Sequence, residues 1–173
     1  MIDSIPKLIQ QAHSLAKEKG WWDDERLPAE LVCLFHSEIS EAFEEYRMGK
    51  MATYYTETPQ GCKPEGFWVE IADLCIRIGD LMGRMGWVQK RNFARLPRHF
   101  QSSQFLFSLH RQVADLIEDG NWNFRGNTRD RLTRILETCL LIAERHDVEL
   151  WEIIDLKHQY NETRPYRHGG KRA

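Results

Sequence analysis

Apolar residues recur at helical spacing along almost the whole chain of 173 residues, and this periodicity constrains the fold more than any other feature. Strand-like alternation is absent, and residues 50–66, rich in Thr, Pro and Gly, are expected to form a loop. The sequence predicts an all-α bundle of about five to six helices in a single domain, 1–173. The expected helices span residues 5–19, 28–48, 67–85, 102–118, 128–146 and 149–163.

Composition limits the classes of partner. Charged residues make up 29% of the chain and its net charge is −2, so no general attraction to nucleic acid or to an anionic membrane is expected. No apolar run approaches the roughly 18 residues that a membrane span needs. Cys33, Cys75 and Cys139 fall in apolar helical stretches and are expected to be reduced core residues. A cytoplasmic protein is therefore predicted, with neither nucleic-acid nor membrane partners.

Acidic residues cluster on two of the predicted helices. Glu38, Glu41 and Glu45 fall in one stripe about 60° wide, and Glu70 and Asp73 follow one border of the apolar arc of the next helix. Carboxylates directed at a seam between helices are costly unless they are paired or metal-bound. A set of oxygen ligands alone suits Mg²⁺ or Mn²⁺, so the spacing predicts a metal site.

A second interpretation is that these faces are simply solvated. On that interpretation Asp73–Arg77 and Asp80–Arg84 are i,i+4 ion pairs along an exposed helix edge. Pairs of acidic residues at this spacing arise often by chance in helical proteins, so spacing alone leaves both interpretations open.

The motif flanks resemble a known family. Glu38-Ile-Ser-Glu41 is followed, after 28 residues, by Glu70-Ile-Ala-Asp73, within HSEISEAFEEYRMGK and KPEGFWVEIADLCIRIGDL. This order of ExxE and ExxD resembles the MazG-like all-α nucleoside triphosphate pyrophosphohydrolases. The Gly20-Trp21 loop and the C-terminal KHQYNETRPYRHGGK also resemble family segments. The resemblance covers residues 12–87 and 148–171. It divides the chain into a motif-bearing half (1–87), a connector with inserted helices (88–147), and a closing helix with a basic tail (148–173).

The resemblance implies a Mg²⁺-dependent hydrolase that converts (d)NTP and water into (d)NMP and pyrophosphate. It implies metal ligands, a general base, phosphate- or sugar-binding residues, and a base-stacking aromatic. The metal ligands would be Glu38, Glu41, Glu70 and Asp73, with Mn²⁺ as a possible substitute for Mg²⁺. The general base would be Glu41 or Glu45, and phosphate or sugar would be bound by Lys157, Asn161 and Arg164. The nucleobase would stack on Trp21 or Trp22, with Phe67 and Trp68 as further candidates.

Two of these assignments have plain alternatives. Lys157, Asn161 and Arg164 share one helix face at i, i+4 and i+7, and a solvated polar face with a salt bridge would show the same spacing. The aromatic residues are equally consistent with packing in a core or an interface. His168 and Lys171 would add positive charge near the phosphates, or belong to a basic tail without that role.

An internal repeat is a further possibility. Residues 36–45 align without gaps with 110–119, and 70–78 align with 134–142. The second copy carries Gln112 and Arg134 where the first has Glu38 and Glu70, so it would not bind a cation in the same way. Any two amphipathic helices can also align this well. The family resemblance implies a homodimer, whereas a true repeat would let residues 102–160 supply the second half within one chain.

Two other functions compete with the hydrolase. One is a non-catalytic helical module that senses nucleotides or binds a protein, as the degenerate second half suggests. The other is a di-metal carboxylate bundle, which needs Glu-x-x-His pairs on facing helices. The chain contains only Asp155-x-x-His158 of this kind, which disfavours the di-metal bundle.

Overall fold

The computed structural model describes residues 1–88 and 101–170, and most of these residues are helical, which confirms the predicted all-α class. Part of the predicted connector, 89–100, and Lys171 lie outside the described residues. All six expected helices are present, and most of their ends lie within one or two residues of the prediction. They are α1 (Ile5–Glu18), α2 (Pro28–Arg47), α3 (Phe67–Arg84), α4 (Ser102–Ala114), α5 (Thr128–Arg145) and α6 (Leu150–Thr163), followed by the short α7 (Arg167–Gly170).

The expected loop at 50–66 contains a β-hairpin, so that part of the prediction was wrong. Strands β1 (Tyr54–Thr58) and β2 (Gly61–Glu65) pair antiparallel, with Tyr54 opposite Glu65. Most residues of the hairpin are exposed, so its sequence lacks the alternation of apolar and polar residues that predicts a strand. Aromatic and β-branched residues in β1 nevertheless favour strand geometry.

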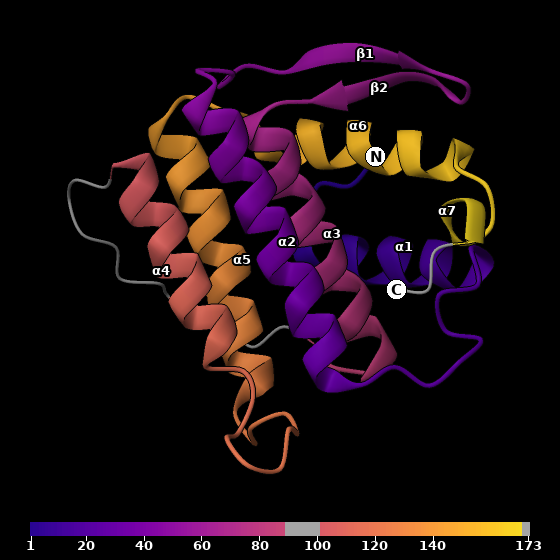
Figure 1. The fold of residues 1–173 in the computed structure, drawn as a ribbon, viewed down its shortest axis with the longest axis vertical. Coiled ribbons are helices and arrows are strands. Elements are labelled where there is room, and N and C mark those ends of the chain that lie inside the picture. The colour runs from indigo at the N-terminus through magenta and orange to yellow at the C-terminus, as the bar shows by residue number, and fades with distance from the viewer. Residues whose placement is uncertain (89–100, 171–173) are drawn as a thin grey trace.

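The helices pack around α3. Helix α2 lies along one side of α3, α4 packs on α2, and α5 packs on α3 (Figure 1). Helices α1 and α6 also pack against α3, and the hairpin lies over α6. Within residues 1–88 and 101–170, no helix combines the length and the apolar character needed to cross a bilayer.

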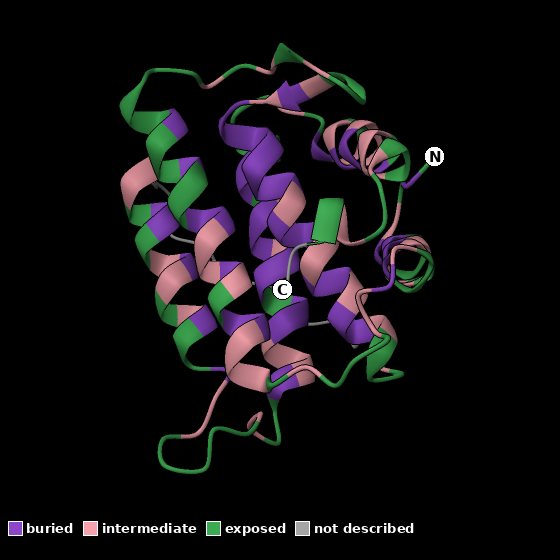
Figure 2. Ribbon diagram, turned by 45° about the vertical axis from the view of Figure 1, so that its right-hand side comes forward, coloured by how far each residue is buried: buried purple, intermediate pink, exposed green. Residues whose placement is uncertain are grey.

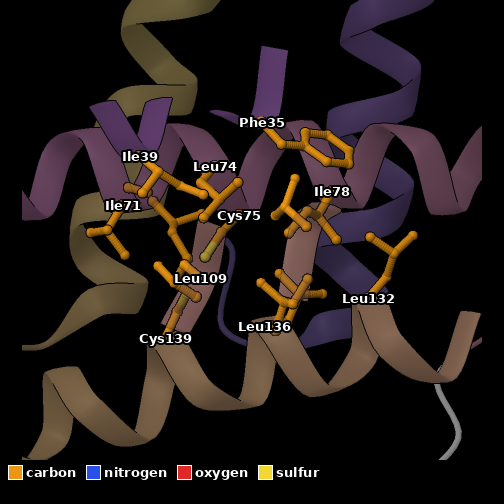
Figure 3. Close-up of a cluster of buried hydrophobic side chains, with 14 of the residues drawn as sticks. Phe35, Ile39, Ile71, Leu74, Cys75, Ile78, Leu109, Leu132, Leu136 and Cys139 are labelled. Atoms are coloured by element: carbon orange, nitrogen blue, oxygen red, sulfur yellow. The ribbon is translucent and has the colours of Figure 1, made fainter. Parts of the chain in front are cut away.

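Burial is greatest on α3, where 12 of 18 residues are buried, and Figure 2 shows buried residues along the middle of the molecule. The core includes Phe35, Leu74, Ile78 and Leu136 from α2, α3 and α5 (Figure 3). A polar group on α3 must therefore find its partners inside the protein.

The cysteines divide into two classes. Cys75 and Cys139 are buried and free, as expected. Cys33 is exposed, so its predicted place in the core was wrong: it lies on the face of α2 that turns away from the core.

Close contact between α1 and α3 depends on small residues. A Cβ atom added at Gly83 would lie 2.4 Å from the Cβ atom of His13, and one added at Gly79 would lie 2.9 Å from Leu8 Cγ. Both glycines have ordinary helical backbone, so space rather than backbone freedom requires them.

Gly83→Ala is therefore expected to destabilise the protein by about 1–3 kcal/mol, because overpacking outweighs the gain in helix propensity. Chemical denaturation measures the loss. Gly126→Ala is the control, since a Cβ atom there meets nothing within 4 Å. Equal stability of the two variants would contradict the close packing of α1 on α3.

Candidate metal centre and adjoining pocket

Three of the four predicted metal ligands converge. Glu38 and Glu41 on α2 and Glu70 on α3 each offer a carboxylate oxygen, and these oxygens lie within 4.8 Å of one another. Glu38 is only 3% exposed and Glu70 only 4%, whereas Glu41 is exposed. Asp73, the fourth predicted ligand, is not part of this cluster.

The turn before α3 sets the position of Glu70. Gly66 precedes the helix with φ +121°, and an added Cβ atom would lie 2.5 Å from the carbonyl oxygen of Ala52. The amide of Phe67 donates to the carbonyl of Lys50 at 3.0 Å, which ties the start of α3 to the chain just after α2. Glu70 thus lies in the first turn of α3, where the helix dipole favours a negative charge.

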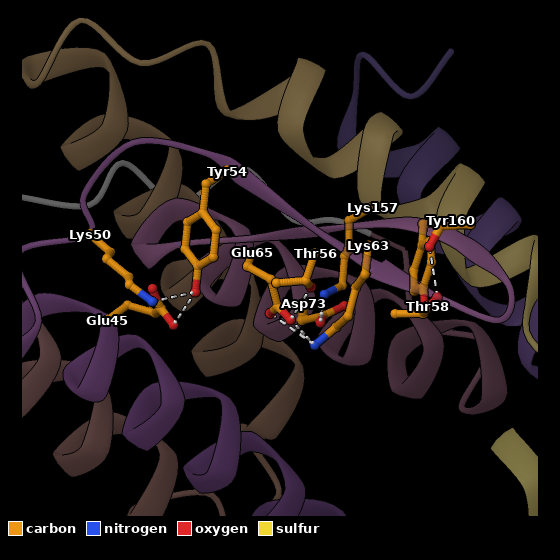
Figure 4. A network of polar contacts seen from close by, with 11 residues as sticks. Glu45, Lys50, Tyr54, Thr56, Thr58, Lys63, Glu65, Asp73, Lys157 and Tyr160 are labelled. Carbon is orange, nitrogen blue, oxygen red and sulfur yellow. Dashed lines mark hydrogen bonds and ion pairs between the residues drawn. The ribbon is translucent and has the colours of Figure 1, made fainter.

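Asp73 instead faces α6. Its carboxylate forms an ion pair with Lys157 at 2.8 Å (Figure 4), and the side-chain amide of Asn161 donates to it at 3.5 Å. Lys157 and Asn161 therefore share a helix face, as predicted. Lys157 is only 1% exposed, so this face is not solvated, although it does hold the salt bridge of the alternative interpretation.

Lys157 remains charged despite its burial. Burial alone would lower the pKa of Lys157, but Asp73 and Glu70 raise it above its ordinary value. The lysine thus neutralises Asp73 at the border of the acidic cluster.

Arg77 belongs to the cluster rather than to an exposed edge. Its Nε donates to Glu38 at 2.5 Å. Asp80 accepts a hydrogen bond from the indole of Trp22 at 2.7 Å and is bound to His13 at 2.8 Å. Among the described residues neither predicted i,i+4 ion pair is formed, so this part of the solvated-face interpretation was wrong.

Burial strongly perturbs two carboxyl groups. Desolvation raises the pKa of Glu38 to about 7, against the opposing effect of Arg77 and with further contributions from Asp73 and Glu41. Desolvation, and then the charge of Asp73, raise the pKa of Glu70 to about 8, although Lys157 opposes the rise. A divalent cation would stabilise the ionised form of both groups, so the donor set fits a hard metal ion.

Glu45 has one oxygen available. Its Oε1 accepts a hydrogen bond from the Tyr54 hydroxyl at 3.1 Å (Figure 4). Its Oε2 is buried and has no hydrogen-bond partner among the described residues. Glu45 also belongs to the lining of an open pocket of about 470 Å³ beside the cluster, formed by Ser40, Glu41, Phe43, Glu44, Glu45, Glu65, Glu70 and His110. Two lining residues, Glu65 from the hairpin and His110 from α4, were not predicted from the sequence.

A second pocket, of about 80 Å³, lies beside Asp73. Trp21, Asn161 and Arg164, three of the predicted substrate-binding residues, line it, together with Arg77. The Oδ1 atom of Asn161 is buried and has no hydrogen-bond partner within the described part of the chain. Arg77 lines this pocket and binds Glu38, so it links the pocket to the acidic cluster. Lys19 and His168 add basic character to the lining.

The remaining aromatic candidates occupy structural positions. Phe67 and Trp68 are buried in the core, as the alternative of simple packing expected. Trp22 binds Asp80, and the guanidinium of Arg84 lies 5.2 Å from its ring centroid. Of the four, only Trp21 lines the pocket beside Asp73.

Comparison of the chain with family models, with curated proteins and with solved structures finds no match.

In the metal-free protein, Glu70 is expected to make stability depend on pH. Because its pKa of about 8 in the folded protein exceeds the ordinary value of 4.5, the contribution of Glu70 to folding stability is fully present below pH 4.5 and is lost as pH rises through 8. With a chelator present, Glu70→Gln should therefore raise the melting temperature at pH 9 by roughly 5 °C and change it little at pH 5.

Thermal melts of wild type, Glu70→Gln and Glu152→Gln at both pH values test this, since Glu152 is exposed on α6. If Glu70→Gln and wild type have the same melting temperature at pH 9, the ionised Glu70 carboxylate does not destabilise the folded protein.

Proposed function

We propose that this protein is a Mg²⁺-dependent nucleoside triphosphate pyrophosphohydrolase, which cleaves (d)NTP into (d)NMP and pyrophosphate. The observation that supports the proposal most is the convergence of Glu38, Glu41 and Glu70 beside a pocket whose lining includes Arg77, Arg164 and Trp21. The resemblance to MazG-like proteins supports the same activity.

The ligand set of the proposal follows the geometry. Glu38, Glu41 and Glu70 would hold the ion, and Asp73 would stay with Lys157 or join them through a rearrangement of that ion pair. When bound, Mg²⁺ would neutralise phosphate charge and make water more acidic. Arg77, bound to Glu38, orients that carboxylate toward the cluster.

Glu45 is the stronger of the two candidate bases. Glu41 belongs to the carboxylate cluster, whereas Glu45 has a buried oxygen that finds no partner in residues 1–88 and 101–170, and a second oxygen that accepts from Tyr54. In the proposed step, water attacks the α-phosphorus, a new P–O bond forms, and the bond to the bridging oxygen breaks. Glu45 takes the proton of the water, and pyrophosphate leaves with the bond electrons.

The pocket beside Asp73 would bind the nucleotide. Arg164 is half-buried and has no ion-pair partner among the described residues, so its guanidinium is available for a phosphate group. Trp21 supplies an aromatic surface for the base, and Asn161 offers an amide to sugar or base. Lys157 would not contact the nucleotide directly but would hold Asp73 in place through their ion pair.

Glu38→Gln is expected to lower the rate of hydrolysis by roughly a hundredfold or more, because it removes a charged ligand of the proposed ion. The protein is incubated with each common NTP and dNTP plus Mg²⁺, and the products are separated by chromatography. Glu152→Gln, an exposed change on α6, is the matched control.

The products discriminate between the functions. Monophosphate and pyrophosphate are the expected products. Diphosphate and orthophosphate would show that the attack occurs at another phosphorus. Mg²⁺ binding without turnover of any nucleotide would favour a non-catalytic nucleotide-sensing module.

Arg164→Ala is expected to raise KM by roughly ten- to a hundredfold with a smaller change in kcat, because a charge-assisted hydrogen bond to phosphate is lost. Arg164→Lys should recover part of the affinity, since it keeps the charge but not the fork of donors. Arg111→Ala, an exposed change on α4, is the control. An unchanged KM for Arg164→Ala would remove Arg164 from the substrate site.

A further inference from the structure

Helices α4 and α5 repeat the local structure of α2 and α3. Helix α2 begins at Pro28 and α4 at Ser102, the same offset of 74 residues that aligns 36–45 with 110–119. At the N-terminus of each of these two helices, the side chain three residues after the N-cap residue accepts a hydrogen bond from the backbone amide of that N-cap residue. Glu30 binds the amide of Leu27 at 3.4 Å, and Gln104 binds that of Gln101 at 3.1 Å.

The connections between the helices also correspond. The β1–β2 hairpin joins α2 to α3. In the connection from α4 to α5, Ile117 and Phe124 form an antiparallel bridge, and the amide of Glu118 donates to the carbonyl of Asn123 at 3.0 Å. Each helix pair is therefore joined by an antiparallel turn, shorter in the second pair.

Equivalent residues of the two pairs meet each other. His36 and His110 are equivalent in the alignment, and their rings stack with Nδ1 atoms 2.8 Å apart. Cys75 and Cys139 are equivalent at the second offset, and both are buried in contact on facing helices (Figure 3). Self-contact of equivalent residues is what a two-fold axis produces, because a residue on the axis meets its own copy.

The directions of the helices agree with such an axis. Helix α2 runs opposite to α4, and α3 opposite to α5 (Figure 1). Trp68 lies seven residues before Cys75, and His146 lies seven after Cys139. Their ring centroids are 5.7 Å apart, which is the antiparallel register that the Cys75–Cys139 contact requires. Helices α4 and α5 lie less close together than α2 and α3, so the copies have diverged.

We infer that α4 and α5 are a degenerate second copy of α2 and α3, related to them by a pseudo-two-fold axis through the His36–His110 and Cys75–Cys139 contacts. One chain thereby builds the complete four-helix bundle without a second chain. The copy also supplies His110 to the wall of the pocket beside the carboxylate cluster.

The second copy has lost its own acidic site. Its positions equivalent to Glu38, Glu41, Glu70 and Asp73 are Gln112, Asp115, Arg134 and Glu137. Two carboxylates remain, and Arg134 places a cation where the first copy has a buried acid. On this inference each chain has one metal site and one equivalent site that has lost two of its four acidic ligands. The Mn²⁺-binding test below rests on the proposed metal centre.

Restoring the lost acids tests the relationship. The double variant Gln112→Glu/Arg134→Glu would recreate the four-carboxylate pattern around Asp115 and Glu137. Mn²⁺ binding is counted by electron paramagnetic resonance, and helical content is followed by circular dichroism. The double variant is expected to bind one Mn²⁺ more per chain than wild type, that is, two instead of one. Gln104→Glu/Arg145→Glu, with the same change of charge at the other end of the same helices, should bind no more than wild type.

A folded double variant with the wild-type stoichiometry would overturn the inference. If the double variant does not fold, Arg134→Glu alone takes its place, since it restores a set of three carboxylates, and the same gain is expected. A wild-type protein that binds no Mn²⁺ would contradict the proposed metal centre, whereas a gain of one Mn²⁺ in the double variant would still support the repeat.

The assembly is tested without metal or substrate. Light scattering should give a mass near 20.5 kDa, that of one chain, and the melting temperature should not depend on protein concentration. A mass of two chains, with a melting temperature that rises with concentration, would show that the bundle needs a partner and would overturn the inference.

Discussion

The burial of acidic side chains between α2 and α3 is the constraint on which the rest of the site depends. Glu38 and Glu70 lie almost wholly out of solvent, where an uncompensated charge is costly. Two cations partly compensate this charge: Arg77 on α3 binds Glu38, and Lys157 on α6 pairs with Asp73 beside the cluster. This partial compensation lets the acids lie close together, and in the proposed metal centre a divalent ion would complete the charge balance.

Two pockets of different chemical character adjoin the acidic cluster. The wide pocket beside Glu41 and Glu45 is acidic, whereas the lining of the small pocket combines Arg77, Arg164 and Trp21 with Asp73 and Asp80. In the proposed complex the flat ring of the nucleotide would lie against Trp21 in the small pocket. Its phosphates would be repelled by the acidic cluster alone, so they would approach it only through a bound cation.

Helical periodicity was sufficient to predict the helices, because each helix has a continuous apolar face that the core requires. The hairpin was missed because it is exposed and carries no such face. Spacing also placed Glu38, Glu41 and Glu70 together, since late α2 must lie beside early α3 when the two helices are antiparallel. It did not show that Arg77 binds Glu38, because spacing along a helix does not fix the direction in which a long side chain extends. It also did not show that Lys157 takes Asp73 out of the cluster, because that depends on which helices are neighbours, with α6 lying beside α3. His110 was beyond sequence reasoning for the same reason.

The Asp73–Lys157 pair joins residues that are 84 positions apart in the chain. During synthesis, α2 and α3 leave the ribosome well before α6, so for that interval Asp73 lacks its buried counter-ion and α3 lacks the helix that covers it. The motif-bearing half is therefore unfinished until the last long helix has been made. The order of synthesis therefore delays the pairing and burial of Asp73, beside the acidic cluster, until α6 has been made.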